Sequence, residues 1–89
     1  MNEEIVTEKS FLQIKSIRTS SNAFIMKLKE GDVIIAIDGE MVHKSYEELS
    51  KELSEIKEKK VITLFRNGVF FNTFIYGSLG VICESITPE

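Results

Sequence analysis

The chain has little of the residues that most often build cross-linked or reactive sites. Its 89 residues contain no tryptophan and only one each of cysteine, histidine and proline. The lone Cys83 excludes a disulfide within the chain and leaves the redox compartment open, and we interpret it as a small hydrophobic residue that is buried or half-buried. One histidine and one cysteine fall short of the ligand sets that hold structural zinc. We therefore expect no metal and no cofactor.

Glycine is also scarce, and the five glycines stand apart from one another as turn residues. A phosphate-binding loop needs closely spaced glycines before a helix, and the sequence has no such run. The only histidine, His43, has no serine or cysteine in a nucleophile motif to act with. The sequence therefore predicts that this chain is not an enzyme.

Positive charge and long apolar runs are both limited. The chain has 11 basic and 14 acidic residues, a formal net charge of −3, so we expect no nucleic-acid partner, which would need a clustered basic surface. The apolar run at residues 33–37 is far shorter than the roughly 20 residues that cross a bilayer. Residues 1–4 do not resemble a signal peptide. We expect no direct membrane insertion and, by default, a cytoplasmic location, although a soluble piece of a longer membrane or secreted protein would look the same.

Apolar residues, by contrast, are plentiful enough to build a core. With 43% hydrophobic and 28% charged residues, the composition is typical of a soluble globular protein. The length suits one domain. We expect a single domain over residues 1–89, with residues 1–9 as a flexible or weakly ordered segment.

Alternating and continuous apolar runs predict five or six short strands. Residues 11–18 alternate from Leu12 onward, but Phe11 and Ile17 fall out of phase, which indicates either a bulge or burial of both faces of the strand. Asp38-Gly39 and Asn67-Gly68 are strong signals for tight hairpin turns. The predicted strands are residues 11–18, 33–37, 40–42, 61–66, 69–76 and 81–86.

Two helices are predicted to cover these strands. A short helical turn at residues 23–28 follows capping side chains, and Ser45 and Glu48 form a capping box that begins a helix at 45–57. The apolar residues of this longer helix form one stripe, which is Tyr46, Leu49, Leu53 and Ile56. We therefore expect an α+β fold, a small curved antiparallel sheet or partial barrel of five to six strands capped by two helices.

The order of these elements resembles that of a PDZ domain. The residues Ser20-Ser21-Asn22-Ala23, Leu28-Lys29-Glu30-Gly31-Asp32 and Asp38-Gly39 are similar to the family's small-residue helix start and its Leu-x-x-Gly-Asp…Asp-Gly core. The helix at 45–57 matches the family's groove helix, and residues 61–68 match its last strand and Arg-x-Gly turn. The resemblance covers residues 17–68.

The two ends depart from the family's usual order. Residues 1–10 contain no glycine and cannot supply the Gly-Φ-Gly-Φ loop that precedes the matching part in the family. A candidate loop lies at the other end, in Gly77-Ser78-Leu79-Gly80-Val81. The chain thus resembles a circularly permuted, bacterial-type PDZ-like domain with its carboxylate-binding loop and groove strand at the C-terminus. The alternative is that this loop matches by chance and the last strand only extends the sheet.

The resemblance implies a scaffold-like module for protein–protein interaction. It implies that an extended peptide or protein C-terminus with an apolar last residue adds as a strand between residues 81–86 and the helix at 45–57. Backbone N–H groups of Leu79, Gly80 and Val81 would hold the ligand carboxylate, and Ile82 and Glu84 would supply backbone hydrogen bonds. The implied peptide-binding residues are Ser78, Leu79, Gly80, Val81, Ile82, Cys83, Glu84, Tyr46, Ser50 and Leu53.

Other interpretations remain open at this point. The domain would equally suit a regulatory or spacer part of a larger membrane-associated protease or secretion protein, as many bacterial PDZ-like domains are. It would also suit a structural homodimer joined through the aromatic strand, where Phe70, Phe74 and Tyr76 share a face. The apolar stripe of the longer helix is in any case what a core-facing helix shows.

Overall fold

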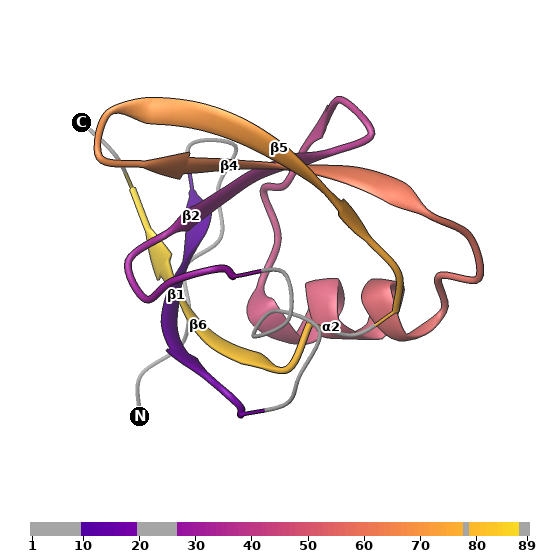
Figure 1. Ribbon diagram of the computed structural model, residues 1–89. Helices are drawn as coiled ribbons and strands as arrows, with labels where there is room; N and C mark the ends of the chain where they lie inside the picture. The colour runs from indigo at the N-terminus through magenta and orange to yellow at the C-terminus, as the bar shows by residue number, and fades with distance from the viewer. Residues whose placement is uncertain (1–9, 20–26, 78, 88–89) are drawn as a thin grey trace.

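The computed structural model describes residues 10–19, 27–77 and 79–87, so the expected flexible segment at 1–9 lies outside the described residues. The elements, in chain order, are β1 (Phe11–Ile17), β2 (Val33–Ile37), β3 (Glu40–Met41), α2 (Tyr46–Ser54), β4 (Lys60–Arg66), β5 (Val69–Ile75) and β6 (Val81–Ile86) (Figure 1).

All strands belong to one antiparallel sheet. Its order is β5-β4-β2-β1-β6, and the short β3 pairs with β2 beside this path. The first and last described strands of the chain, β1 and β6, therefore lie side by side. Figure 1 shows the sheet curling, with β5 and β4 across the top and β1 and β6 running down one side. The two edge strands of the path are β5 and β6.

Both predicted tight turns are confirmed. Asn67 and Gly68 have φ angles of 49° and 79°, and they join strands that pair from Arg66↔Val69 onward. Asp38 and Gly39, with φ angles of 50° and 82°, connect β2 to β3 in the same way. Two consecutive positive φ values give a turn whose twist matches that of the flanking strands, which is why Asn-Gly and Asp-Gly are favoured there.

Of the two alternatives for the first strand, a bulge or burial of both faces, the structure shows a bulge. The pairing of β1 with β6 shifts register between Ile14 and Ser16. Leu12 and Ile14 are fully buried on one side of this shift, and Ile17 packs against the same core on the other side. The extra residue in β1 thus lets an out-of-phase apolar residue reach the interior.

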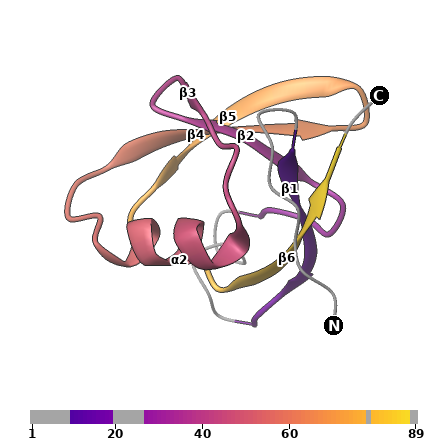
Figure 2. The ribbon, with the colours of Figure 1, turned by 180° about the vertical axis from the view of Figure 1, so that it is seen from behind.

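Helix α2 begins as the capping box predicts. The Ser45 side chain accepts a hydrogen bond from the Glu48 N–H at 3.2 Å. The helix ends at Ser54 rather than near residue 57, because Glu55 and Ile56 close the last turn with bonds to Glu52 and Leu53. Figure 2 shows α2 beneath the curved sheet. The core between them is Leu12, Ile14, Leu28, Ile34, Val42, Leu49, Leu53, Ile62, Leu64, Ile75, Leu79 and Val81.

A buried carboxylate joins the β1–β2 connection to the end of β4. Asp32 is 1% exposed, and its two oxygens accept bonds from Nε and Nη2 of Arg66, both at 2.7 Å. The Lys29 N–H donates to the same carboxylate at 2.9 Å. Hydrogen bonding to Asp32 raises the pKa of Arg66 above its ordinary value. The guanidinium also lies 4.5 Å from the Phe71 ring centroid, so one side chain ties three segments together.

The expected fold class, an α+β fold capped by two helices, is wrong. The described residues form one open, sheet-dominated structure of six antiparallel strands with a single helix, instead of a sheet or partial barrel capped by two helices. Of the expected helical turn at 23–28, residues 20–26 lie outside the described residues, and Lys27 has a φ of 62°, which no right-handed helix adopts. One helix suffices physically, because the sheet curls around α2 and buries the helix's apolar stripe on its concave face.

Candidate functional site

The strongest candidate site lies where α2 runs beside the outer edge of β6. A pocket of about 210 Å³ opens there, between the helix and the start of the strand. We call it the groove pocket, and its lining residues are Arg18, Tyr46, Leu49, Ser50, Leu53, Leu79, Gly80 and Val81. A neighbouring hollow of about 190 Å³ shares Arg18, Tyr46, Gly80 and Val81 with it and extends to Ile82. Together the two hollows follow β6 along its edge.

The main chain at the start of β6 points into this groove. Ile17 and Val81 are partners in the β1–β6 ladder, and the next N–H along β1, that of Arg18, donates to the Gly80 carbonyl at 2.9 Å. In an antiparallel ladder this bond marks Ile17 and Val81 as a pair that does not bond directly. The N–H and carbonyl of Val81 therefore point away from β1, toward α2.

The same register corrects one detail of the site expected from the sequence. Backbone groups alternate in direction along a strand, so those of Ile82 and Glu84 point at β1, and those of Val81 and Cys83 point at the outer edge. A strand added at this edge would therefore pair one residue out of step with the expected Ile82 and Glu84 contacts. Which backbone groups of β6 face the outer edge depends on the register of β6 with β1, and the sequence of β6 does not reveal that register.

Tyr46 links the helix to this edge. Its hydroxyl donates a hydrogen bond to the Val81 carbonyl, across the groove from α2 to β6. Tyr46 is half-buried, and its side chain packs against the core while its hydroxyl reaches β6. Tyr46 thus already bonds to the Val81 carbonyl oxygen, the acceptor that an added strand would need at this position.

The loop before β6 contains two glycines with positive φ angles. Gly77 and Gly80 have φ angles of 79° and 75°, conformations in which a side chain would be strained. Leu79, which lies between the two glycines, is buried in the core and anchors the loop. Ser78, also among the expected site residues, lies outside the described residues.

Six of the ten expected residues line the groove pocket, namely Tyr46, Ser50, Leu53, Leu79, Gly80 and Val81. Ser50 and Leu53 line it from α2, one turn and two turns after Tyr46. Ile82 lines the neighbouring hollow and is 61% exposed. Cys83 was expected to be buried or half-buried, and it is half-buried and packs against the core. Glu84 is exposed, does not line either hollow, and lies 3.7 Å from Lys15 in an ion pair.

Sequence reasoning missed one residue of the site, Arg18. Its exposed side chain lines both hollows beside Gly80, and it is the only cationic residue among the described residues that line them. The bulge in β1 and the register Ile17↔Val81 bring it there. A single arginine at the end of a strand carries no sequence signal for this placement.

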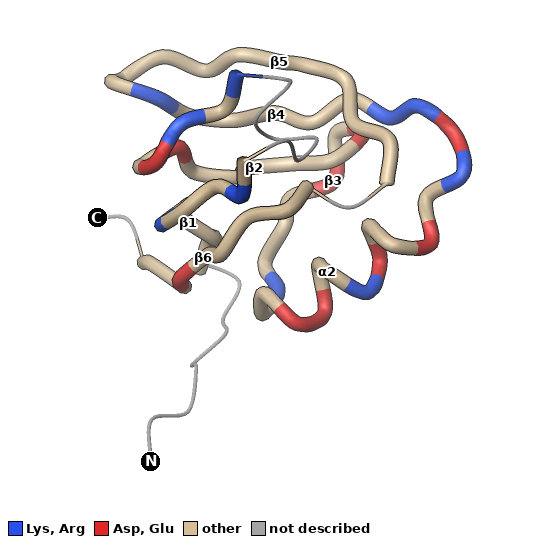
Figure 3. The backbone as a smooth tube through the Cα atoms, turned by 60° about the horizontal axis from the view of Figure 1, so that its bottom comes forward, with Lys and Arg blue, Asp and Glu red and all other residues tan. Residues whose placement is uncertain are grey.

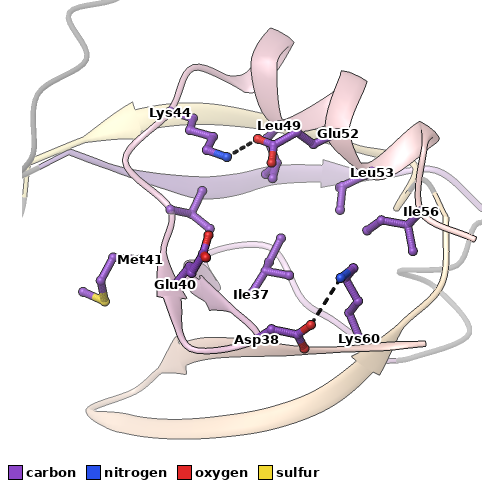
Figure 4. Close-up of a pocket in the computed structure, with 11 residues that line it drawn as sticks. Ile37, Asp38, Glu40, Met41, Lys44, Leu49, Glu52, Leu53, Ile56 and Lys60 are labelled. Carbon is purple, nitrogen blue, oxygen red and sulfur yellow. Dashed lines mark hydrogen bonds and ion pairs between the residues drawn. The ribbon is translucent and has the colours of Figure 1, made fainter. Parts of the chain in front are cut away.

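A second pocket lies on the opposite flank of α2, and Figure 4 shows it. Its volume is about 240 Å³, its floor includes Ile37, Leu49 and Leu53, and its rim carries the ion pairs Lys44–Glu52 and Lys60–Asp38. The β2 strand beside it is already paired with β1, β3 and β4. The other strand that lines it, β3, is only two residues long, so this pocket suits the addition of an extended peptide strand less well than the groove pocket.

The described residues show no arrangement for metal chemistry. Among them, no three His, Cys, Asp or Glu side chains gather as a metal site would require. His43 instead contacts residues at the start of β1. Its Nδ1 lies 2.9 Å from the Ser10 carbonyl oxygen, and its ring centroid is 4.8 Å from that of Phe11. Within the same residues, no helix has the length and apolar character to span a membrane.

The comparisons with known proteins add no further constraint on the site. No family model matches the chain, and no curated protein matches it either.

Proposed function

We propose that this chain is a PDZ-like interaction module that binds an extended C-terminal peptide as an added strand between β6 and α2. The observation that carries the proposal is the direction of the Val81 main chain, whose N–H and carbonyl point from an edge strand into a pocket beside a helix. An edge strand with such a pocket offers both main-chain bonds for affinity and side-chain contacts for selectivity.

The apolar end of the groove pocket suits the last side chain of the ligand. Leu49, Leu53 and Leu79 supply aliphatic surface there, and Ser50 is half-buried at its side. Burial of an aliphatic side chain contributes about 1.5–3 kcal/mol, enough to select an apolar terminal residue over a polar one. We therefore propose a partner that ends in leucine, valine or isoleucine.

The terminal carboxylate of the ligand would lie beside Gly80, in the loop before β6, and beside Arg18. Gly80 lines the pocket where its missing side chain permits close approach of the backbone to a ligand. Arg18 adds a positive charge at the same position. A carboxylate placed there would gain charge-assisted hydrogen bonds, which are stronger than neutral ones.

The sheet order supports the resemblance to a permuted PDZ-like domain. The resemblance implies that the strand after the glycine-bearing loop is an edge strand, that it lies beside the groove helix, and that its sheet neighbour is the strand at residues 11–18. In the structure β6 is an edge strand beside α2 and pairs with β1. The single described helix of the open sheet is the one that this site needs.

The proposal is tested by titrating the labelled protein with peptides that end in Val or Leu, followed by NMR. We expect shifts concentrated at Tyr46, Ser50 and residues 79–83, and at least about tenfold weaker binding when the terminal carboxylate is amidated, because its charge-assisted bonds are lost. Equal binding of free and amidated peptides, or no binding at all, would contradict the proposal. The second result would favour the spacer interpretation.

A matched pair of helix variants separates a groove effect from a helix effect. Ser50→Phe should block the pocket, whereas Ser54→Phe makes the same change on an exposed residue that does not line it. We expect loss of binding for the first variant only. Equal behaviour of the two variants would show that the ligand lies elsewhere.

A further inference from the structure

The other edge of the sheet, β5, has an unusual surface. Phe70 and Phe74 are 62% and 59% exposed, on the face of the strand that turns away from the core. Edge strands are usually protected from pairing by lysine, proline or a bulge. All seven residues of β5 are uncharged, none is proline, and its register with β4 is unbroken from Arg66↔Val69 to Lys60↔Ile75. Figure 3 shows this strand free of charged residues along its length.

Three residues in the middle of β5 have backbone N–H and carbonyl groups that point away from β4 and are available for pairing. The two-residue turn makes Arg66 and Val69 a directly hydrogen-bonded pair, so alternate residues from Val69 bond to β4. The backbone groups of Phe70, Asn72 and Phe74 therefore point away from β4. Among the described strands, none pairs with that side of β5.

The sequence of β5 is also nearly symmetric about Asn72. Reading outward from Asn72 in Val69-Phe70-Phe71-Asn72-Thr73-Phe74-Ile75, phenylalanine is two residues away on both sides, and a β-branched aliphatic residue is three away on both sides. An antiparallel pair of identical strands has a twofold axis, and its two copies must present the same surface. With the axis at Asn72, Phe70 of one copy pairs with Phe74 of the second copy, and Phe74 of the first copy pairs with Phe70 of the second. The backbone groups of both residues point away from β4, so each pair can form hydrogen bonds directly.

We infer that the chain forms a homodimer in which β5 pairs antiparallel with β5 of a second copy about a twofold axis at Asn72. The dimer joins two sheets edge to edge and gathers four exposed phenylalanine rings on one surface. Within each copy the Phe65 ring lies 4.8 Å from that of Phe70, and the Lys59 ammonium lies 5.2 Å from the Phe74 ring, so the aromatic surface extends into the sheet. Aromatic pairs directly across an antiparallel ladder stabilise it.

This dimer is independent of peptide binding. No residue of β5 lines the groove pocket or the hollow beside it, and β5 and β6 are the two different ends of the sheet order. A failure of either proposal therefore leaves the other untouched, and each is measured by its own experiment.

Sedimentation equilibrium between about 10 μM and 1 mM tests the dimer. We expect a monomer–dimer equilibrium for the natural sequence and at least about tenfold weaker association for Asn72→Lys, which places two like charges at the axis. Met41→Lys is the matched control, because it adds the same charge to an exposed residue of β3, and it should associate normally. A natural chain that stays monomeric at 1 mM, or equal weakening by both variants, would overturn the inference.

Mixing experiments test the register. Phe70→Lys and Phe74→Glu should each associate weakly alone, but their mixture should recover, because the register places the new lysine opposite the new glutamate of the second copy. Phe70→Lys mixed with Phe70→Glu should not recover, since residue 70 meets residue 74. Recovery in the second mixture instead of the first would overturn the proposed axis. Circular dichroism of each variant identifies any that does not fold, and the remaining variants, with Asn72→Lys, then decide the result.

Discussion

At the scale of single residues, the site depends on a few side chains whose partners are distant in sequence. Tyr46 and Val81 are 35 residues apart and meet through one hydrogen bond, and Arg18 reaches the groove only through the β1–β6 register. The sequence pattern placed Tyr46, Ser50 and Leu53 on one side of a helix, because that placement follows from helical spacing alone. It did not reveal Arg18 or the direction of the Val81 main chain, because both depend on the pairing of two strands from opposite ends of the chain.

The Tyr46 hydroxyl should compete with the ligand. In the structure it donates to the Val81 carbonyl, which an added strand needs as an acceptor. Tyr46→Phe removes the competing bond, whose net contribution is about 1 kcal/mol, so we expect roughly fivefold tighter peptide binding by isothermal titration calorimetry. Weaker binding by this variant would contradict the competition and mean that the hydroxyl contacts the ligand itself.

Arg18 should act through charge on the terminal carboxylate. We expect Arg18→Ala to weaken binding of a free-carboxylate peptide about two- to fivefold, the range of an exposed ion pair, and to leave the amidated peptide unaffected. Lys15→Ala is the matched control, because Lys15 lies on the same strand but pairs with Glu84 outside the groove. If both alanine variants weaken binding equally, the effect is one of net charge and not of the site.

At the scale of elements, local signals predicted what local interactions build. The two hairpin turns and the capping box of α2 each depend on residues within four positions of one another, and the structure confirms all three. The end of α2 was placed too far along, since no glycine or proline marks it and the chain instead turns toward β4. The helix count was wrong for a different reason, because the number of helices that a sheet needs depends on how strongly it curls.

The Asp32–Arg66 pair, which joins β4 to the β1–β2 connection, should contribute strongly to the free energy of unfolding. Asp32→Asn keeps the size of the side chain but leaves the Arg66 guanidinium without its charged partner and removes an acceptor from a buried site. We expect a loss of about 2–3 kcal/mol in the free energy of unfolding, reduced from the value for a fully buried pair because Arg66 is partly exposed. Urea denaturation measures it, and an unchanged midpoint would show that the pair contributes only geometry.

Asp38 should make the β2–β3 turn sensitive to acid. A hydrogen bond from the Val61 N–H, at 2.8 Å, lowers the pKa of Asp38, desolvation opposes the shift, and Lys60 adds to the lowering. Because the folded pKa is depressed, the stabilisation is fully present above the unfolded pKa of about 3.9 and is lost as pH falls through the folded value. Between about pH 5 and pH 2, Asp38→Asn should therefore lose less stability in thermal melts than the natural chain. Parallel curves for the two proteins would contradict this origin.

At the scale of the whole molecule, the open sheet leaves two edges with different characters. The β6 edge lies beside a helix and a pocket, and the β5 edge carries exposed aromatic residues and no charge. A closed barrel would have offered neither edge, so both proposals depend on the sheet being open. Closure could not be predicted from the strand patterns, because it depends on whether the two end strands meet.

Amide hydrogen exchange at β6 tests the central claim most directly, because it reports on the main chain and not on side chains. A bound peptide strand should slow exchange of the Val81 N–H, which points at the groove, and leave the neighbouring Ile82 N–H, which points at β1, essentially unchanged. Saturation with a tight free-carboxylate peptide that changes neither amide, or that protects Ile82 and not Val81, would contradict the account.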